Sequence, residues 1–441
     1  MRRLPLSLAA VLLLATLHML VFDRGLGGDG WAGFALLESV ADDGDLWLED
    51  DHRGVMNGLV PGDAGTSGRH LVSQYPPGIL ALDALPFLAG RFLDSLLPAG
   101  ILADGADLPP VGRVPRGVFL SAALIVLSRN LAALLGVFWT GLALLRLGVP
   151  ERTAALASAL AFFGGPMLFY SLVGMTHAPT FALSGLLLWL LAPWRSETRN
   201  EPRPWLALAA GLTVGGAVLV RYSAVALLAP ALLAVRGWRD RLLVLIGFGL
   251  PLLVLPVWWR LLFGAWGMPP YGGSWQITPA SPWNVLFAPV HGLFLFHPAL
   301  LFAAAGLVLA LRRRQEPGWT CAVWFLAVAV LHGWWSEWAN TGGYGQRFLG
   351  DALPALAFGF AAWLQPARRP VLRWLPCVAA ALVGWVLFFA AVGGLVLPPA
   401  PYPWPQRLGE YAVLLREPPG PAALREALGR ASFALRGLLS R

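Results

Sequence analysis

Lysine is missing from this sequence of 441 residues, and charged residues of every kind make up only 13% of it. A soluble domain carries about 25% charged residues, so this composition excludes an ordinary soluble enzyme. Disordered chains and fibrous repeats are excluded as well, because 57% of the residues are apolar and no internal repeat is visible. The two cysteines, Cys321 and Cys377, both lie in apolar runs. They predict buried thiols and exclude a disulfide framework or a cysteine zinc centre.

The positive charge of the chain comes entirely from Arg. There are 32 Arg residues, the formal net charge is +8, and the isoelectric point is about 10.3. A basic chain can bind nucleic acid, but the Arg residues of a membrane protein gather in its cytoplasmic loops. We therefore expect membrane lipids, and no nucleic acid, among the partners.

Apolar runs of bilayer-spanning length recur along the chain and predict an all-α integral membrane protein with about eleven transmembrane helices. The first run follows Arg2 and Arg3 and lacks a small-residue cleavage site before Asp23, which favours a membrane helix over a signal peptide. The expected spans cover residues 5–22, 131–147, 153–172, 177–194, 205–220, 223–235, 242–261, 288–311, 318–335, 348–365 and 374–397.

The Arg residues also predict the orientation of these spans. With groups such as Arg2-Arg3 and Arg312–Arg314 in the cytoplasm, every connection obeys the positive-inside rule. Arg221 separates two short runs, and a single span there would place its charge in mid-membrane and invert everything after it. Two spans are therefore expected. The external side then receives residues 23–128, 262–287, 336–347 and 398–441.

The first external segment, residues 23–128, is too long for a simple connection. An amphipathic helix is expected near residues 31–40. The apolar segment 79–97, with Asp83 inside it, is expected to lie in the membrane interface. We divide the chain into a transmembrane catalytic domain, residues 1–397, and an external tail, residues 398–441, which begins Pro-rich and ends in an amphipathic helix.

Asp29 lies between two glycines shortly after the first expected span. Glycines allow a backbone to approach a ligand closely. A carboxylate at a membrane surface can act as the general base on an acceptor hydroxyl or amine. The alternative is a structural Asp that caps the helix beginning at Trp31.

Several segments, in order and on the expected side, resemble the GT-C glycosyltransferases. The similarity is greatest to the branch that contains protein O-mannosyltransferases and lipid A aminoarabinose transferases. It extends to about residue 365 and is carried by Gly28-Asp29-Gly30-Trp31, Asp43-Gly44-Asp45-Leu46, Gln74-Tyr75-Pro76-Pro77-Gly78, residues 170–181, residues 211–222 and Tyr344-Gly345-Gln346-Arg347.

This resemblance implies a GT-C type helical bundle and a transferase that uses a polyprenyl-phosphate sugar as its donor. Transfer occurs at the outer membrane face, usually with inversion at the anomeric carbon, and the acceptor is a glycan, a lipid or a protein. The catalytic acid of the family lies just after the first helix, which corresponds to Asp29 in this sequence.

The leaving group of such a reaction is a phosphate, and fixed cations stabilise the charge that develops on it. Arg suits this task because its planar fork binds two phosphate oxygens. Arg129, Arg221 and Arg347 are expected at the external ends of helices, on the same side as Asp29, with Arg260 as a weaker fourth candidate. The alternative for each is an interfacial Arg whose head reaches water.

A substrate pocket is expected from His177, which stands where related transferases often place an acid, and from aromatic and His side chains on the same side. These are Tyr75, Tyr344, His291 and Trp275, with His297 and His332 as further candidates for the sugar pocket. The alternative is a belt of aromatic residues at the bilayer boundary.

Two features depart from the family or leave its chemistry open. Some relatives carry Lys beside the Pro-Pro motif, where this sequence has Ser73, Gln74 and Tyr75. The acidic stretch that includes Asp43 and Asp45 offers oxygen ligands for a divalent metal, although a solvated turn explains it equally well.

Two other functions remain open from the sequence: a transporter or flippase for a lipid-linked or anionic substrate, and a non-catalytic assembly partner. Transporters place ionisable groups near the bilayer midplane. The expected spans contain almost no acids, with Asp351 as the main exception. The pattern therefore favours chemistry at one surface, in a bacterial inner membrane with the active site on the periplasmic side.

Overall fold

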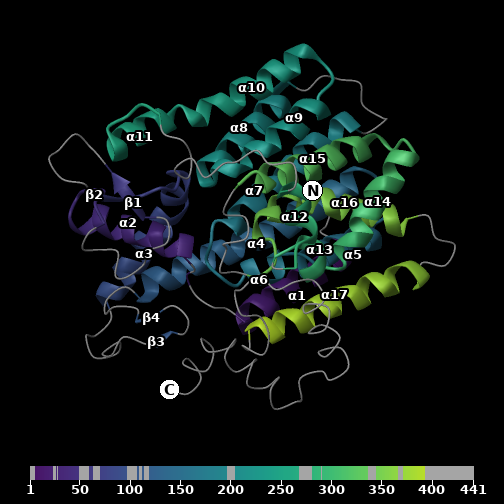
Figure 1. The fold of residues 1–441 in the computed structure, drawn as a ribbon, viewed down its shortest axis with the longest axis horizontal. Helices are drawn as coiled ribbons and strands as arrows, with labels where there is room; N and C mark the ends of the chain where they lie inside the picture. Colours follow the sequence, from purple (N-terminus) through teal and green to yellow (C-terminus); the bar gives the residue numbers. More distant parts are fainter. Residues whose placement is uncertain are drawn as a thin grey trace.

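The computed structural model describes residues 5–22, 26, 28–48, 59–62, 70–96, 107–108, 112–113, 119–195, 204–267, 281–289, 291–335, 344–365 and 371–392. Helices make up nearly all of this described part (Figure 1), which confirms the prediction of a helical chain. The tail, residues 398–441, lies outside it, so the division into two domains stays a prediction.

The described part of residues 1–118 contains three helices and two short antiparallel hairpins, and the hydrophobic pattern did not predict these hairpins. In the first hairpin Leu59 lies opposite Ser73, and in the second Asp107 lies opposite Arg113. The elements are α1 (Leu6–Phe22), α2 (Gly28–Asp42), β1 (Leu59–Gly62), β2 (His70–Ser73), α3 (Gly78–Leu96), β3 (Asp107–Leu108) and β4 (Gly112–Arg113).

A bundle of longer and broken helices forms the rest of the described chain. Its elements are α4 (Phe119–Arg146), α5 (Glu151–Phe163), α6 (Met167–Tyr170), α7 (His177–Leu191), η1 (Ala192–Arg195), α8 (Pro204–Val220), η2 (Tyr222–Leu227), α9 (Leu228–Ala234), α10 (Trp238–Leu252), α11 (Val254–Phe263), α12 (Ser281–Phe287), α13 (Leu293–Phe296), α14 (Leu300–Arg312), α15 (Glu316–Gly333), η4 (Arg347–Ala352), α16 (Leu353–Leu364) and α17 (Val371–Val392).

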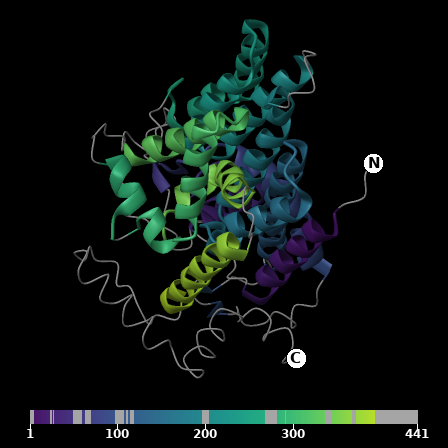
Figure 2. The ribbon, with the colours of Figure 1, turned by 90° about the vertical axis from the view of Figure 1, so that its right-hand side faces the viewer.

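The centre of the bundle is formed by α7 and α16, whose residues are almost all buried. α4 packs along α7, α14 packs along α16, and α10 packs along α8. α1 and α17 lie side by side at the edge of the bundle (Figure 1 and Figure 2), where the rings of His18 and Trp385 pack at 5.3 Å between centroids. A single apolar core joins these helices.

Helix α4 begins at Phe119, twelve residues earlier than the span expected at 131–147. The reason is a cap supplied by α3. The carboxylate of Asp94 accepts hydrogen bonds from the backbone N–H of Leu120, at 3.0 Å, and from the hydroxyl of Ser121, at 2.9 Å. A carboxylate at a helix N-terminus satisfies free N–H groups and complements the helix dipole.

Two expected spans are interrupted in the structure. The span 153–172 breaks between α5 and α6 at Gly164-Gly165-Pro166, and the span 288–311 breaks at His297-Pro298. Proline cannot continue the hydrogen-bond pattern of a helix. The break expected at Arg221 is confirmed, because this residue adopts an extended conformation (φ −152°, ψ 121°) between α8 and η2.

Two segments of the described chain are long and apolar enough to cross a membrane by length and composition: residues 120–146 and 238–263. Five shorter apolar helices lie at residues 6–20, 204–220, 222–234, 300–312 and 372–388. The expected number of spans therefore stays a prediction. Large apolar side chains are exposed on several of these helices, including Leu131 of α4 and Leu250 of α10.

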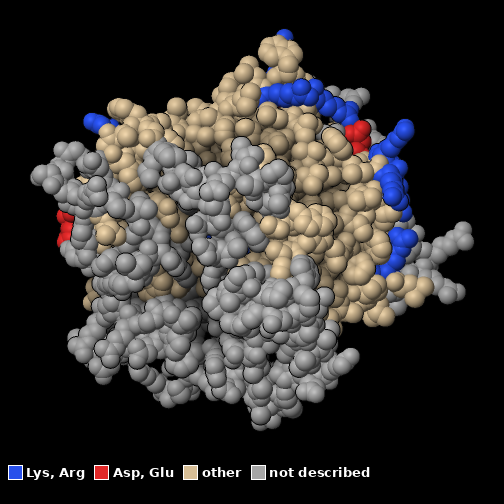
Figure 3. Space-filling view, viewed as in Figure 1, with Lys and Arg blue, Asp and Glu red and all other residues tan. Residues whose placement is uncertain are grey.

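Exposed Arg residues gather where the loops before α10 and α15 meet. Arg236 and Glu316 join the two loops with a charge contact of 3.6 Å. The exposed basic residues nearby in the sequence are Arg239, Arg241 and Arg312–Arg314. Figure 3 shows most of the basic side chains in view along one edge of the described surface, and most of its remainder carries no charged side chain.

Candidate functional site

Arg221 stands at the centre of a buried polar cluster formed by three separate parts of the chain. Its Nη1 donates a hydrogen bond to Nδ1 of His177 at 2.9 Å and lies 3.7 Å from Oδ1 of Asp351. All three side chains are buried. His177 begins α7, Arg221 follows α8, and Asp351 lies in η4. Residues expected on one side of the membrane therefore meet inside the protein.

The protonation of His177 follows from this contact. A guanidinium only donates hydrogen bonds, so Nδ1 of His177 accepts, and the ring proton is on Nε2. That Nε2–H has no hydrogen-bond partner among the described residues. A buried donor without a partner is rare in native proteins, which makes this atom a candidate contact for an anionic or hydroxylated ligand.

The ring of Phe348 holds the second cation of the cluster next to the first. The guanidinium carbon of Arg221 lies 5.3 Å from the ring centroid, and that of Arg347 lies 4.8 Å from it. The imidazole of His332 stacks on the same ring at 5.0 Å, with 14° between the planes. Cations are attracted to the faces of aromatic rings. Phe348 therefore keeps two positive groups close together in a buried place.

Two close backbone contacts attach the N-terminal segments to this cluster. A Cβ on Gly30 would collide with the carbonyl oxygen of Gly174, three residues before His177. A Cβ on Gly78 would lie 2.5 Å from backbone atoms of Leu219, two residues before Arg221. Only glycine permits such approaches. The first turn of α2, which contains Asp29, is thus placed beside the start of α7, although the side chain of Asp29 lies outside the described part.

Arg129 does not lie at a helix end, contrary to expectation. It lies within α4 and is buried. Its Nε donates to Oδ1 of Asp83 at 2.9 Å, and its Nη2 forms an ion pair with Oδ2 of the same residue. The carboxylate of α3 therefore neutralises Arg129, so that α4 continues through this position. Its Nη1 has no hydrogen-bond partner among the described residues, so the expected contact of Arg129 with a phosphate stays a prediction.

The aromatic candidates are placed differently from one another. The hydroxyl of Tyr344 donates to the carbonyl oxygens of Phe296, at 3.2 Å, and Gly384, at 2.9 Å, and so joins α13 to α17. The carbonyl oxygen of Tyr75 accepts a hydrogen bond from Trp258 Nε1 at 3.2 Å.

The ring of His291 stacks on that of Phe296 at 6.1 Å between ring centroids. Trp275 lies outside the described residues. The weaker candidate Arg260 donates to the carbonyl oxygen of Gly264, at the end of its own helix.

Tyr222 follows Arg221 and connects the cluster to α11. Its hydroxyl accepts a hydrogen bond from Trp259 Nε1 at 3.1 Å.

The acidic turn after α2 has a structural explanation. Oδ1 of Asp45 accepts hydrogen bonds from the Ser39 hydroxyl, at 2.8 Å, and from the Trp47 N–H, at 2.9 Å. Asp43 is exposed. Within the described chain, no group of three or more His, Cys, Asp or Glu side chains is arranged to hold a metal ion. The carboxylate of Asp45 therefore stabilises the turn, and a divalent metal at Asp43 and Asp45 stays a prediction.

Sequence reasoning missed two members of the cluster, Asp351 and Phe348. The sequence does single out Asp351, because it is the main acid in the expected spans, but nothing in the sequence indicates that it pairs with Arg221.

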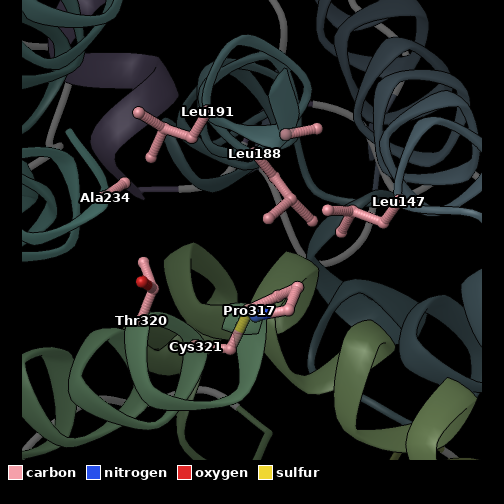
Figure 4. A pocket seen from close by; sticks show the side chains of 8 residues that line it. Leu147, Leu188, Leu191, Ala234, Pro317, Thr320 and Cys321 are labelled. Atoms are coloured by element: carbon pink, nitrogen blue, oxygen red, sulfur yellow. The ribbon is translucent and has the colours of Figure 1, made fainter. Parts of the chain in front are cut away.

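A small pocket lies away from the cluster, where apolar side chains of α7 and α9 face the start of α15 (Figure 4). Its lining consists of Leu147, Leu188, Leu191, Ala192, Ala234, Pro317, Thr320 and Cys321.

Neither a family model nor a curated protein sequence matches the chain. Among solved structures, the chain is similar to ArnT from Cupriavidus metallidurans, which was solved with undecaprenyl phosphate bound. The two are 14% identical with a TM-score of 0.49, and the match covers 97% of this chain and 74% of that one.

The chain is also similar to the oligosaccharyltransferase of Archaeoglobus fulgidus, both in its apo form and as AglB with an inhibitory peptide and a dolichol-phosphate. Here the identity is 13% and the TM-score 0.48, and the match covers 97% of this chain but 55% of that one. The chain therefore spans about half the length of this enzyme.

Proposed function

We propose that this chain is an integral membrane glycosyltransferase of the GT-C type. It transfers a sugar from a polyprenyl phosphate to an acceptor at the outer membrane face, with inversion at the anomeric carbon. The observation that carries the proposal is the cluster of the buried residues Arg221 and His177 with the half-buried Arg347. It offers two cations and an unpartnered N–H, the groups that bind a phosphate.

The proposed reaction assigns a role to each of these groups. The acceptor oxygen or nitrogen attacks the anomeric carbon, and the bond from that carbon to the phosphate oxygen breaks. The phosphate leaves with the electron pair, and the two guanidinium groups stabilise its charge. Asp29 takes the acceptor proton as the general base. The contact between Gly30 and Gly174 supports this role, because it places the backbone of Asp29 beside the segment that leads to His177.

The distribution of surface residues supports the proposed membrane orientation. Exposed leucines on α4 and α10 suit contact with lipid, which accepts apolar surface without cost. The exposed Arg groups before α10 and α15 suit the cytoplasmic side. α3 faces its two buried carboxylates, Asp83 and Asp94, toward the protein and exposes Leu85 and Phe92. This arrangement suits a helix that lies in the membrane interface.

Asp29→Asn is the direct test of the proposed base. Membranes that contain wild type or variant at matched levels receive radiolabelled polyprenyl-phosphate sugars, and label is followed into lipid, protein and polymer fractions. We expect the variant to insert and fold but to transfer sugar roughly 10²–10⁴-fold more slowly, the usual effect of losing a general base.

A suitable control is Asp42→Asn, at the other end of α2. Asp42 pairs with Arg91 at 2.6 Å in an exposed contact, and exposed ion pairs contribute little to stability. Transfer by Asp42→Asn should equal that of wild type. Transfer by Asp29→Asn at the wild-type rate would contradict the assignment of the base.

A further inference from the structure

The side chain of Gln346 is fully buried, and neither its Oε1 nor its Nε2 has a hydrogen-bond partner among the described residues. Burying an amide without hydrogen-bond partners costs free energy relative to leaving it in water. The residue lies next to Arg347, one of the two cations of the cluster. A ligand that offers both a hydrogen-bond donor and an acceptor would satisfy the Gln346 amide.

Two buried His residues flank the same segment. The ring of His297 packs so close to Gly345 that a Cβ there would lie 2.7 Å from His297 Nε2. The ring of His332 stacks on Phe348, and its Nδ1 donates to the carbonyl oxygen of Val328 at 2.8 Å. In a neutral ring this leaves Nε2 of His332 as an acceptor. Nε2 of each His lacks a partner within the described part.

We propose that Gln346, His297 and His332 form a subsite for the hydroxyl groups of the donor sugar, beside the phosphate-binding cations. This inference rests on the proposed function. A sugar hydroxyl donates and accepts hydrogen bonds, which matches an amide, whereas a phosphodiester only accepts them. The sugar is bonded directly to the phosphate, so it must lie next to Arg347. Gln346 and Arg347 are consecutive in the sequence, so one short segment supplies both kinds of contact.

The test compares two lipids that differ only in the sugar. The purified full-length protein in lipid nanodiscs binds either polyprenyl phosphate or the same lipid that carries mannose, glucose, galactose or N-acetylglucosamine. Gln346→Met removes the amide and keeps the length of the side chain. Gln365→Met is the matched control, because Gln365 is exposed at the end of α16.

We expect wild type to bind at least one sugar-bearing lipid more tightly than polyprenyl phosphate, and Gln346→Met to lose about tenfold or more of that affinity while its affinity for polyprenyl phosphate stays the same. The thermal midpoint of Gln346→Met should not fall, because the change removes an unpartnered buried amide.

An equal loss for both lipids, no loss for either, or a wild type that binds all the sugar-bearing lipids no better than polyprenyl phosphate overturns the subsite alone. A wild type that binds none of these lipids overturns the proposed function and the subsite with it.

Discussion

Arg221 combines three contacts that a different cation cannot reproduce. One guanidinium nitrogen reaches His177 and Asp351, and the plane lies over Phe348. Lysine would keep the charge but lose the planar fork and most of the ring contact. The identity of this residue, and not only its charge, therefore determines the shape of the cluster.

We expect Arg221→Lys to weaken the binding of polyprenyl phosphate by about 10- to 100-fold, the usual effect of losing a charge-assisted hydrogen bond and its geometry. Arg239→Lys, an exposed change, is the control and should bind as wild type does. The measurement is lipid binding in nanodiscs. Unchanged affinity in Arg221→Lys would mean that the phosphate binds elsewhere.

At the residue scale the sequence could predict the cations but not their partners. Arg221, Arg347 and His177 lie at the ends of expected spans. Their common side of the membrane is therefore enough to group these three residues. The pairing of Arg221 with Asp351 depends on contacts between helices that are far apart in the chain. The same holds for Arg129: its helix was expected to begin after it, because an isolated charge is costly in a membrane, and the acid that neutralises it lies on α3.

Helices α3 and α4 are joined by the buried pair of Asp83 and Arg129. Breaking such a pair from one side leaves an unpaired charge in the interior, at a cost of about 3–5 kcal/mol. Replacing both residues with apolar ones leaves no unpaired charge in the interior. We therefore expect the loss of one charge to destabilise the contact between α3 and α4 more than the loss of both.

We expect Asp83→Asn to lower the thermal midpoint of the purified protein strongly. The double variant Asp83→Leu with Arg129→Met should recover most of the loss, because apolar side chains often replace a buried ion pair at little cost. A scan of thermal midpoints in detergent distinguishes these outcomes. A double variant as unstable as Asp83→Asn would mean that the pair contributes specific hydrogen bonds that packing cannot replace.

Close packing of Gly78 on Leu219 links the start of α3 to the end of α8. We expect Gly78→Ala to push these segments apart and to lower both the thermal midpoint and sugar transfer. Gly216→Ala, within α8, is the matched control because a Cβ there meets no atom within 4 Å. Alanine favours a helix over glycine, so the control should be as stable as wild type or slightly more stable. Similar losses in both variants would contradict the contact.

At the element scale the hydrophobic runs predicted most helices and the break at Arg221. They did not predict the breaks at Gly164–Pro166 and at His297-Pro298. Each apolar run is long enough to span a membrane, and hydrophobicity alone does not show that the helix inside it is interrupted. The hairpin of β1 and β2 was missed for a different reason. Each strand has four residues, too few to show an alternating pattern.

The whole molecule has two chemically different ends. The cluster around Arg221, with α2 beside it, occupies one end of α7, and the pocket lined by Leu191 and Pro317 lies at its other end. Exposed Arg groups accompany the second end. This polarity supports the proposed orientation and can be tested without an activity assay.

Single cysteines report the orientation directly, because Cys321 and Cys377 are buried and give little background. In intact cells, a membrane-impermeant maleimide should label Asp43→Cys, next to α2, and should not label Arg313→Cys, before α15. Both positions are exposed. Permeabilised cells are the control and should show both labelled. The reverse pattern would place the cluster in the cytoplasm.

The absence of lysine gives the buried cluster a property of its own. A buried lysine can lose its proton near neutral pH, whereas the guanidinium groups of Arg221 and Arg347 stay charged throughout the range in which proteins are folded. The positive charge of these two side chains therefore does not change when the pH of the medium changes. A molecule exposed to a changing environment keeps a fixed attraction for anions, and only its carboxylates and imidazoles remain to sense the proton concentration.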